Sequence, residues 1–158
     1  MNEVIESILN LLRTNLGAAY KKYYYGEIRV AAQMEFPMIE VIPNTSRITN
    51  RGTGGMTDNN FDIIIVVKST LKKYLGGNKG EKLNHTQDLV KRIEERDTDG
   101  TIKSTTVLGV LHDNLKLIKD GVRFADIKDN WEIDYEESDL GDSYIVQATI
   151  SFTVKRIN

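Results

Sequence analysis

The chain has 158 residues, the size of one typical domain, so we expect a single hydrophobic core over residues 1–158. Hydrophobic residues make up 40% and charged residues 28%, a balance typical of globular proteins and not of disordered ones. The net charge of −2 argues against a dedicated duplex-DNA-binding module, which needs a clustered positive surplus. The lack of cysteine excludes disulfides, thiol catalysis and thiolate metal sites.

Histidine is almost as scarce, because only His85 and His112 are present, so a catalytic triad or multi-histidine metal site is hard to assemble. Each lies near an end of a predicted helix among ordinary polar residues, and we interpret both as surface residues. The N-terminus lacks the pattern of a signal peptide, and the longest apolar run, Ile63 to Val67, is too short to span a bilayer. We therefore expect no membrane partner and assembly in a cytoplasm.

The first element is predicted to be an amphipathic helix over residues 2–16. Asn2 is expected to cap its start, and Gly17 to supply the left-handed residue that follows its end. The apolar residues share one stripe at helical spacing: Val4, Ile5, Ile8, Leu9, Leu12 and Leu16.

Four tyrosines and two lysines follow between Tyr20 and Tyr25. Such a mixture can bind single-stranded nucleic acid, but aromatic residues that lead into a strand more often form a packing corner, and we favour the corner. Strands are predicted at 27–33 and 37–42, interrupted at Phe36-Pro37, and Pro43 is expected to end the second one.

Residues 44–60 are polar and contain three glycines. Unstructured loops of this length are uncommon inside compact domains, so the segment is either a long hairpin arm or a mobile binding loop. The strand predicted at 61–68 carries apolar residues on both faces, which indicates a central position in the sheet.

The rest of the chain alternates between helical and extended patterns. We expect a helix at 81–96, a turn at 97–100 with Gly100 at positive φ, and a short helix at 105–115. Residues 121–135 are predicted to be irregular, with an extended end at 131–135. Strict alternation of apolar and polar residues predicts a strand at 144–154.

This order of elements predicts an α+β domain. We expect an antiparallel or mixed β-sheet, packed on one side by the N-terminal helix and a second, central helix, with a long β-hairpin-like arm at 44–60.

Two glycine clusters and one acidic turn superficially resemble ligand sites. Gly52–Gly55 and Gly76–Gly80 match neither a dinucleotide fingerprint nor a Walker motif, so we interpret both as loops. The segment from Glu95 to Thr106 matches several positions of a calcium-binding EF-hand loop, but Thr106 stands where a bidentate Glu is required. A helix-terminating turn explains the same residues, and we expect no cofactor or metal.

Charge is distributed unevenly along the chain. Residues 1–82 carry 11 basic and 8 acidic groups, whereas residues 83–158 carry 10 basic and 15 acidic ones. Eight acids lie within 126–142, beside a single lysine. This stretch is either a solvated acidic loop or a surface that faces a basic partner or passing DNA.

Taken together, the chain resembles the tail terminator, or tail-completion, proteins of tailed bacteriophages. The resemblance lies in the order and character of several segments. They are the helix at 2–16, the segment Phe36 to Pro43, the Gly/Arg/Thr-rich segment 44–57, the strand 62–67, Leu89 to Asp97 with Asp99-Gly100, Thr106 to Leu111, and the alternating strand 144–154.

The resemblance implies a structural virion protein and not an enzyme. Members of the family form hexameric rings on the last ring of the tail tube, stop tube polymerisation, and offer a surface to a head-completion or neck protein. DNA passes through the lumen without sequence-specific binding. The resemblance thus implies a location at the neck end of the virion tail, after assembly in the host cytoplasm.

We assign interface roles by our own inference, since the family offers no catalytic motif to transfer. In the arm, Arg47 and Arg51 are the expected anchors, with Met56 and Asp58 beside them, because arginine can pair bidentately with carboxylates. The acidic stretch would face a basic subunit or the DNA, through Asp126, Asp129, Glu132, Glu136 and Glu137.

Two other function classes remain open from the sequence. One is a related head-side connector, stopper or other neck protein. The other is a small calcium- or nucleotide-binding module or enzyme.

Overall fold

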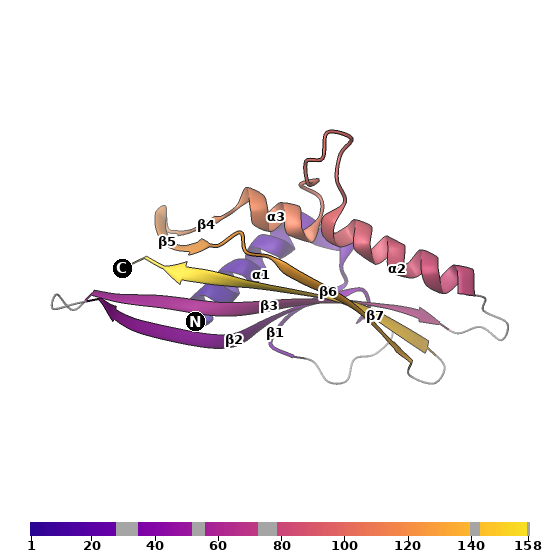
Figure 1. Cartoon of the computed structure of the whole chain (residues 1–158), viewed down its shortest axis with the longest axis horizontal. Helices are drawn as coiled ribbons and strands as arrows, with labels where there is room; N and C mark the ends of the chain where they lie inside the picture. Colours follow the sequence, from indigo (N-terminus) through magenta and orange to yellow (C-terminus); the bar gives the residue numbers. More distant parts are fainter. Residues whose placement is uncertain (28–34, 52–55, 73–78, 140–142, 158) are drawn as a thin grey trace.

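The computed structural model describes residues 1–27, 35–51, 56–72, 79–139 and 143–157 (Figure 1). They form a mixed α+β fold in which helices pack on one side of a curled β-sheet, as predicted. The elements in chain order are α1 (Asn2–Leu16), the 3-10 turn η1 (Gly17–Ala19), β1 (Lys22–Tyr25), β2 (Met38–Arg51), β3 (Met56–Lys72), α2 (Lys79–Glu94), α3 (Val107–Asp113), β4 (Lys116–Lys119), β5 (Val122–Ile127), β6 (Glu132–Asp139) and β7 (Ser143–Arg156).

The sheet follows the order β1-β2-β3-β7-β5-β4, and β6 pairs with β7 beside this path. Strands β1 and β2 are parallel, and the other pairs are antiparallel. Strand β7 therefore has β3 along one edge, while its other edge pairs first with β6 and then, near its end, with β5. The predicted strand at 61–68 is central, as expected, because β3 lies between β2 and β7.

The N-terminal helix matches its prediction, but its caps differ. Its apolar stripe is buried against the sheet, where Ile5, Ile8 and Leu12 have no exposed surface. The predicted Asn2 cap is wrong: the N-cap is Met1, which makes no side-chain capping bond, and Asn2 Oδ1 instead accepts a hydrogen bond of 2.6 Å from Tyr25. Gly17 has a positive φ, 48°, as expected, but its ψ of −124° is not that of the left-handed helical conformation.

The prediction of a hairpin arm at 44–60 is confirmed. Strands β2 and β3 stay paired from Met38↔Lys68 out to Arg51↔Met56 (Figure 1). The prediction that Pro43 ends its strand is wrong. Strand β2 continues past the proline, because the register of its pairing with β3 shifts between Pro43 and Thr45. The predicted strand at 27–33 falls almost wholly outside the described residues.

The extended end predicted at 131–135 is confirmed as the start of β6, but the preceding residues, predicted to be irregular, contain β5, and β4 lies before them. The β4–β5 turn is Asp120-Gly121, with φ of 51° and 76°. An Asp-Gly pair between extended segments is a signature of a two-residue hairpin, so the missed signal was present in the sequence. The error arose because β4 has only four residues and only Leu117 among them is buried.

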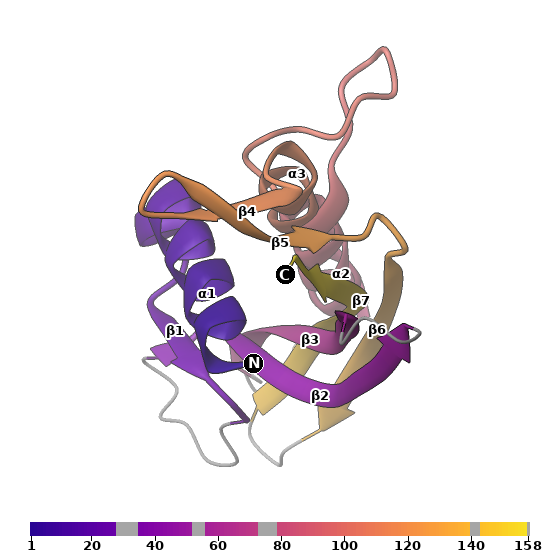
Figure 2. The same ribbon diagram turned by 90° about the vertical axis from the view of Figure 1, so that its left-hand side faces the viewer.

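The second and third helices lie beside α1 on the same face of the sheet (Figure 2). Helix α3 is shorter than predicted, and its N-cap is Thr106, whose side chain accepts a hydrogen bond of 3.0 Å from the Gly109 amide. Between α2 and α3 the predicted turn is present, with Gly100 at φ 86°.

Candidate interaction surfaces

The root of the arm is held by a polar cluster on the face of the sheet opposite the helices. Arg47 of β2 lies 3.2 Å from Asp62 of β3, and its side chain is 71% exposed. Asp62 also accepts a hydrogen bond of 3.1 Å from Thr153 of β7, which in turn is bonded to Asn130. These contacts connect the arm to the sheet at the point where it leaves the body.

Farther out, the backbone register places the other predicted arm residues near the tip. Arg51 pairs with Met56, and Thr49 pairs with Asp58. The side chains of Arg51, Met56 and Asp58 lie outside the described part of the structure. The structure therefore brings the four predicted arm residues into one hairpin, and it describes a side-chain contact for Arg47 alone.

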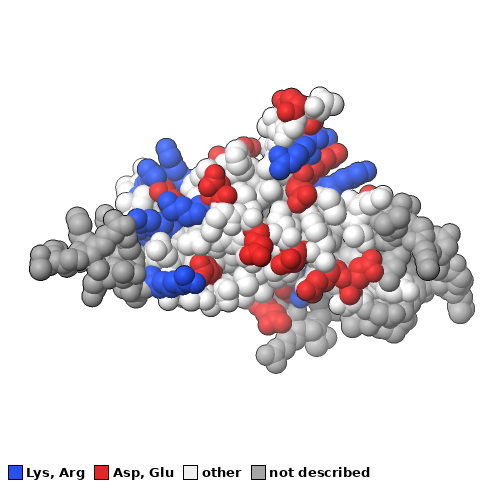
Figure 3. Space-filling view, viewed as in Figure 1, with Lys and Arg blue, Asp and Glu red and all other residues white. Residues whose placement is uncertain are grey.

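Within the acidic stretch, residues 132–139 form strand β6 and not a loop. In β6, Glu132, Asp134 and Glu136 are exposed and alternate with half-buried Ile133 and Tyr135. Their carboxylates therefore share the face of the sheet that lies away from the helices. Figure 3 shows acidic side chains gathered over the middle of the molecule, where β6 runs.

Two neighbours orient the acids of β6. Gln147 of β7 donates a hydrogen bond of 3.1 Å to Glu136 Oε2. Glu137 is exposed on the next position and accepts a hydrogen bond of 3.0 Å from Thr86 of α2. The exposed Asp129 precedes the strand in the connection from β5.

Asp126 does not belong with the other predicted acids. It lies on β5, where Arg123 donates two hydrogen bonds to its carboxylate, one of them 2.7 Å from Nε to Oδ1. Hydrogen bonding to Arg123 holds the pKa of Asp126 below its ordinary value, and Lys128 and Lys116 act in the same direction. Asp126 is therefore neutralised locally, and the acidic surface consists of β6 and Asp129.

A basic end of the molecule was missed by sequence reasoning, because β4 and β5 were not predicted. Lys119 lies 2.6 Å from Glu3 of α1, and Arg156 lies 3.5 Å from the same carboxylate. Both cations lower the pKa of Glu3, the hydrogen bond from Lys119 most strongly. Basic side chains gather at this end in Figure 3, away from the acids of β6.

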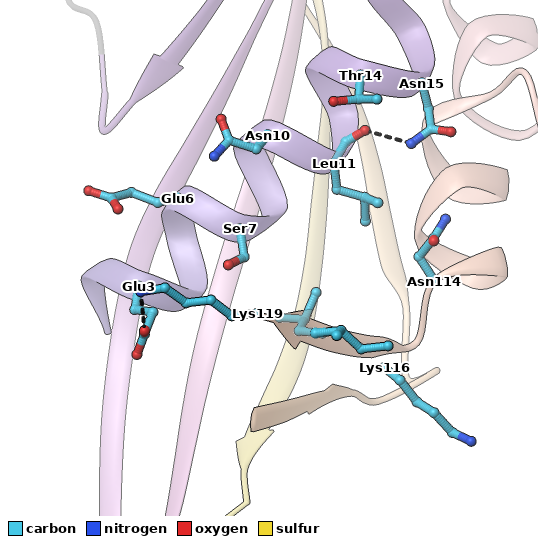
Figure 4. Close-up of a pocket in the computed structure, with 12 residues that line it drawn as sticks. Glu3, Glu6, Ser7, Asn10, Leu11, Thr14, Asn15, Asn114, Lys116 and Lys119 are labelled. Atoms are coloured by element: carbon cyan, nitrogen blue, oxygen red, sulfur yellow. Dashed lines mark hydrogen bonds and ion pairs between the residues drawn. The ribbon is translucent and has the colours of Figure 1, made fainter. Parts of the chain in front are cut away.

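A groove of about 470 Å³ runs between α1 and β4. Figure 4 shows the Glu3–Lys119 pair at one end of it, and the polar side chains Ser7, Asn10 and Thr14 along the helix. The groove contains both acidic and basic groups from facing elements, so it has no marked preference for a charged ligand.

In the described residues, neither His112 nor the acidic turn lies in a cluster of side chains that could form a site. His112 is 56% exposed and lies 3.7 Å from Asp113, as expected of a surface residue, while the His85 side chain lies outside the described part. In the acidic turn, Asp99 Oδ1 accepts a bond of 2.9 Å from the Thr101 amide and Glu95 pairs with Lys103. Among the residues that the structure describes, no group of three or more His, Asp or Glu could hold a metal ion.

No helix in the described ranges is long and apolar enough to cross a membrane. No protein-family model matches the chain, and no curated protein matches its sequence.

Proposed function

We propose that this chain is a structural subunit of a phage virion, which caps the tail tube as a hexameric ring. The ring ends tube polymerisation and offers the surface on which a head-completion or neck protein joins the tail. The observation that carries the proposal is the β2–β3 hairpin, which continues as a paired arm past the helix-covered body of the molecule (Figure 1).

The arm is suited to reach a neighbouring protein. Its two strands are paired in one register from Thr45↔Asp62 to Arg51↔Met56, so it extends as a continuation of the body rather than as a free loop. Arg47 is mostly exposed despite its contact with Asp62, and exposed ion pairs contribute little to stability. Its guanidinium can therefore exchange Asp62 for a carboxylate of the tube or of another subunit at little cost.

The acidic face of β6 supports the same proposal. Glu132, Asp134 and Glu136 repel phosphate groups, so a lumen lined by them lets DNA pass without binding it. The same side chains attract a basic protein surface. Both uses fit a protein that acts through contacts with its own copies and with its neighbours in the particle.

The proposal is tested by removing the distal arm. Residues 46–57 are deleted, which joins Thr45 to Asp58, and the variant replaces the intact chain in tail assembly. Circular dichroism and thermal unfolding first establish that the body is still folded. Electron microscopy then measures tail length and the fraction of tails joined to heads.

We expect overlong tails, and tails that carry no head, in the presence of the folded deletion variant. Tails of normal length that still join heads would overturn the role of the arm. A tag imaged by negative stain between the head and the neck, and not on the tail tube, would favour a head-side connector or stopper instead.

A further inference from the structure

Several strand edges of the sheet lack a strand partner in the described residues, and two of them, on β2 and β6, lie on opposite sides of the sheet. Strand β1 covers β2 only from Met38 to Val41, so in the described residues the outer edge of β2 from Ile42 to Arg51 has no strand partner. Strand β6 pairs with β7 along one edge, and no described strand pairs with its other edge. Unpaired backbone N–H and C=O groups on such edges are templates for strand addition from another chain.

The strand directions allow the β2 edge of one copy to pair with the β6 edge of another. The order across the sheet is β2, β3, β7 and β6, and each neighbouring pair is antiparallel. Strands β2 and β6 therefore run in opposite directions. If a second copy stands beside the first in the same orientation, its β2 edge meets the β6 edge of the first copy in antiparallel sense.

The charges of the two edges are opposite in sign. The free part of β2 carries two arginines, Arg47 and Arg51, and no acid. Strand β6 carries four acids between Glu132 and Glu137. Because like charges on facing strands are destabilising, two β6 edges repel each other, whereas a β6 edge attracts a β2 edge.

The two edges are offset along the strand direction. Across the sheet, Ile42 is level with Ile64, Ser151 and Glu132. From this level the free edge of β2 runs toward the arm tip, and β6 runs the other way. Pairing two copies therefore shifts each along the strands relative to the next, and a sheet that closes on itself requires such a stagger.

We infer that the free edge of β2 in one copy of this chain pairs with the free edge of β6 in the next, which joins the copies into one continuous sheet. The contact is head-to-tail, so it closes into a ring when the rotation between copies closes. The inference deepens the proposed function, on which it rests for the ring, and assigns the subunit contact to two named edges.

The absence of native cysteine allows a clean crosslinking test in the full chain. Thr45→Cys is combined in turn with Asp134→Cys, Glu136→Cys or Ser138→Cys, which step along β6 by two residues and so sample neighbouring registers. Thr45→Cys combined with Asp113→Cys is the matched control, because Asp113 is exposed but lies on α3. After mild oxidation at high protein concentration, denaturing electrophoresis under non-reducing conditions measures the crosslinked species.

We expect at least one edge pair to give a ladder of oligomers that ends at the closed ring. On the denaturing gel, each single-cysteine variant and the Thr45→Cys/Asp113→Cys control should run as uncrosslinked monomers. Adding Arg47→Glu to the responsive pair should lower the crosslinked fraction several-fold, and a further Glu132→Lys should restore part of it.

The inference is overturned if no edge pair crosslinks, whether light scattering finds rings or monomers under the same conditions. Rings without edge crosslinks would leave the proposed function standing and place the contact elsewhere. Conversely, edge-crosslinked rings that fail to stop tube growth would support the subunit contact and overturn the capping role.

Discussion

Lys68 reaches across from β3 to Glu40 of β2, with its Nζ 3.0 Å from Oε1, and the Glu40 side chain has no exposed surface. The pair lies on the face of the sheet opposite the helices, next to Met38, which is also fully buried. A carboxylate in such surroundings depends on its partners, because burial removes the water that would otherwise solvate it.

Replacing Lys68 by Met should therefore lower the free energy of unfolding by about 3–5 kcal/mol, the range for an ion pair broken inside a protein. The double variant Glu40→Leu/Lys68→Met should recover most of this loss, since neither charge is then buried alone. Urea titration followed by circular dichroism measures both. A double variant less stable than Lys68→Met would contradict the explanation.

The N-cap of α3 offers a second prediction. Thr106 is 2% exposed, donates a hydrogen bond of 2.7 Å to Lys103 O and accepts one from the Gly109 amide. Thr106→Ala should cost about 1–2 kcal/mol in the free energy of unfolding. Thr106→Ser keeps the hydroxyl and should retain most of the stability, so equal losses in the two variants would rule out the capping role.

Gly109 should tolerate no larger side chain. A Cβ on this residue would lie 1.9 Å from the Lys103 carbonyl oxygen, so Gly109→Ala must displace either α3 or the preceding turn. We expect a loss of thermal stability larger than that of Thr106→Ala. Gly100→Asn, at an open site with φ 86°, is the matched control and should be milder.

Tyr20 should affect stability at alkaline pH. Burial raises the pKa of its phenol to about 12, against a smaller opposing effect of Arg92, which lies 5.6 Å above the ring. The folded state thus prefers neutral Tyr20, and the stability it provides should be present below pH 10 and be lost as the pH rises toward 12. The hydroxyl has no hydrogen-bond partner in the described structure.

Tyr20→Phe should consequently leave stability at pH 7 unchanged or slightly higher, and flatten its decline above pH 10. Thermal unfolding across this range measures the profile. Tyr25→Phe, at a 44% exposed position, serves as the control. An unchanged alkaline decline in Tyr20→Phe would show that another group causes it.

The ion pair of Asp126 and Arg123 should contribute to the loss of stability at acidic pH. Because Arg123 lowers the pKa of Asp126, the contribution of this carboxylate to stability is present at neutral pH and is lost as the pH falls through its lowered pKa. Arg123→Ala should move the Asp126 titration midpoint up toward the ordinary aspartate value, which NMR of the carboxyl carbon measures. A midpoint that stays low would assign the shift to other neighbours.

Replacing Arg47 should reduce assembly with little effect on the stability of the fold. Its side chain is 71% exposed, whereas that of Asp62 is 24% exposed, so Arg47→Ala should change the free energy of unfolding by less than about 1 kcal/mol. Under the proposed function it should nevertheless reduce tail capping. Lys128→Ala, which removes an exposed cation outside the arm, is the matched control for net charge.

The sequence predicted those elements whose apolar pattern is long and regular. The stripe from Val4 to Leu16 and the alternating apolar residues from Val146 to Val154 are all buried, so periodicity was sufficient to identify α1 and β7. It was insufficient for β4, where a single buried residue, Leu117, is no periodic signal.

For the candidate surfaces, the sequence determined which residue types are present and in which segments: an arginine-bearing hairpin segment, an acid-rich stretch, no cysteine and few histidines. Only the tertiary structure decided how these residues are grouped. It separated Asp126 from the other acids by placing Arg123 against it, and put the free edges of β2 and β6 on opposite sides of one sheet. The physical reason is that charge and periodicity are local properties of the chain, whereas strand order and ion pairing depend on contacts between residues distant in sequence.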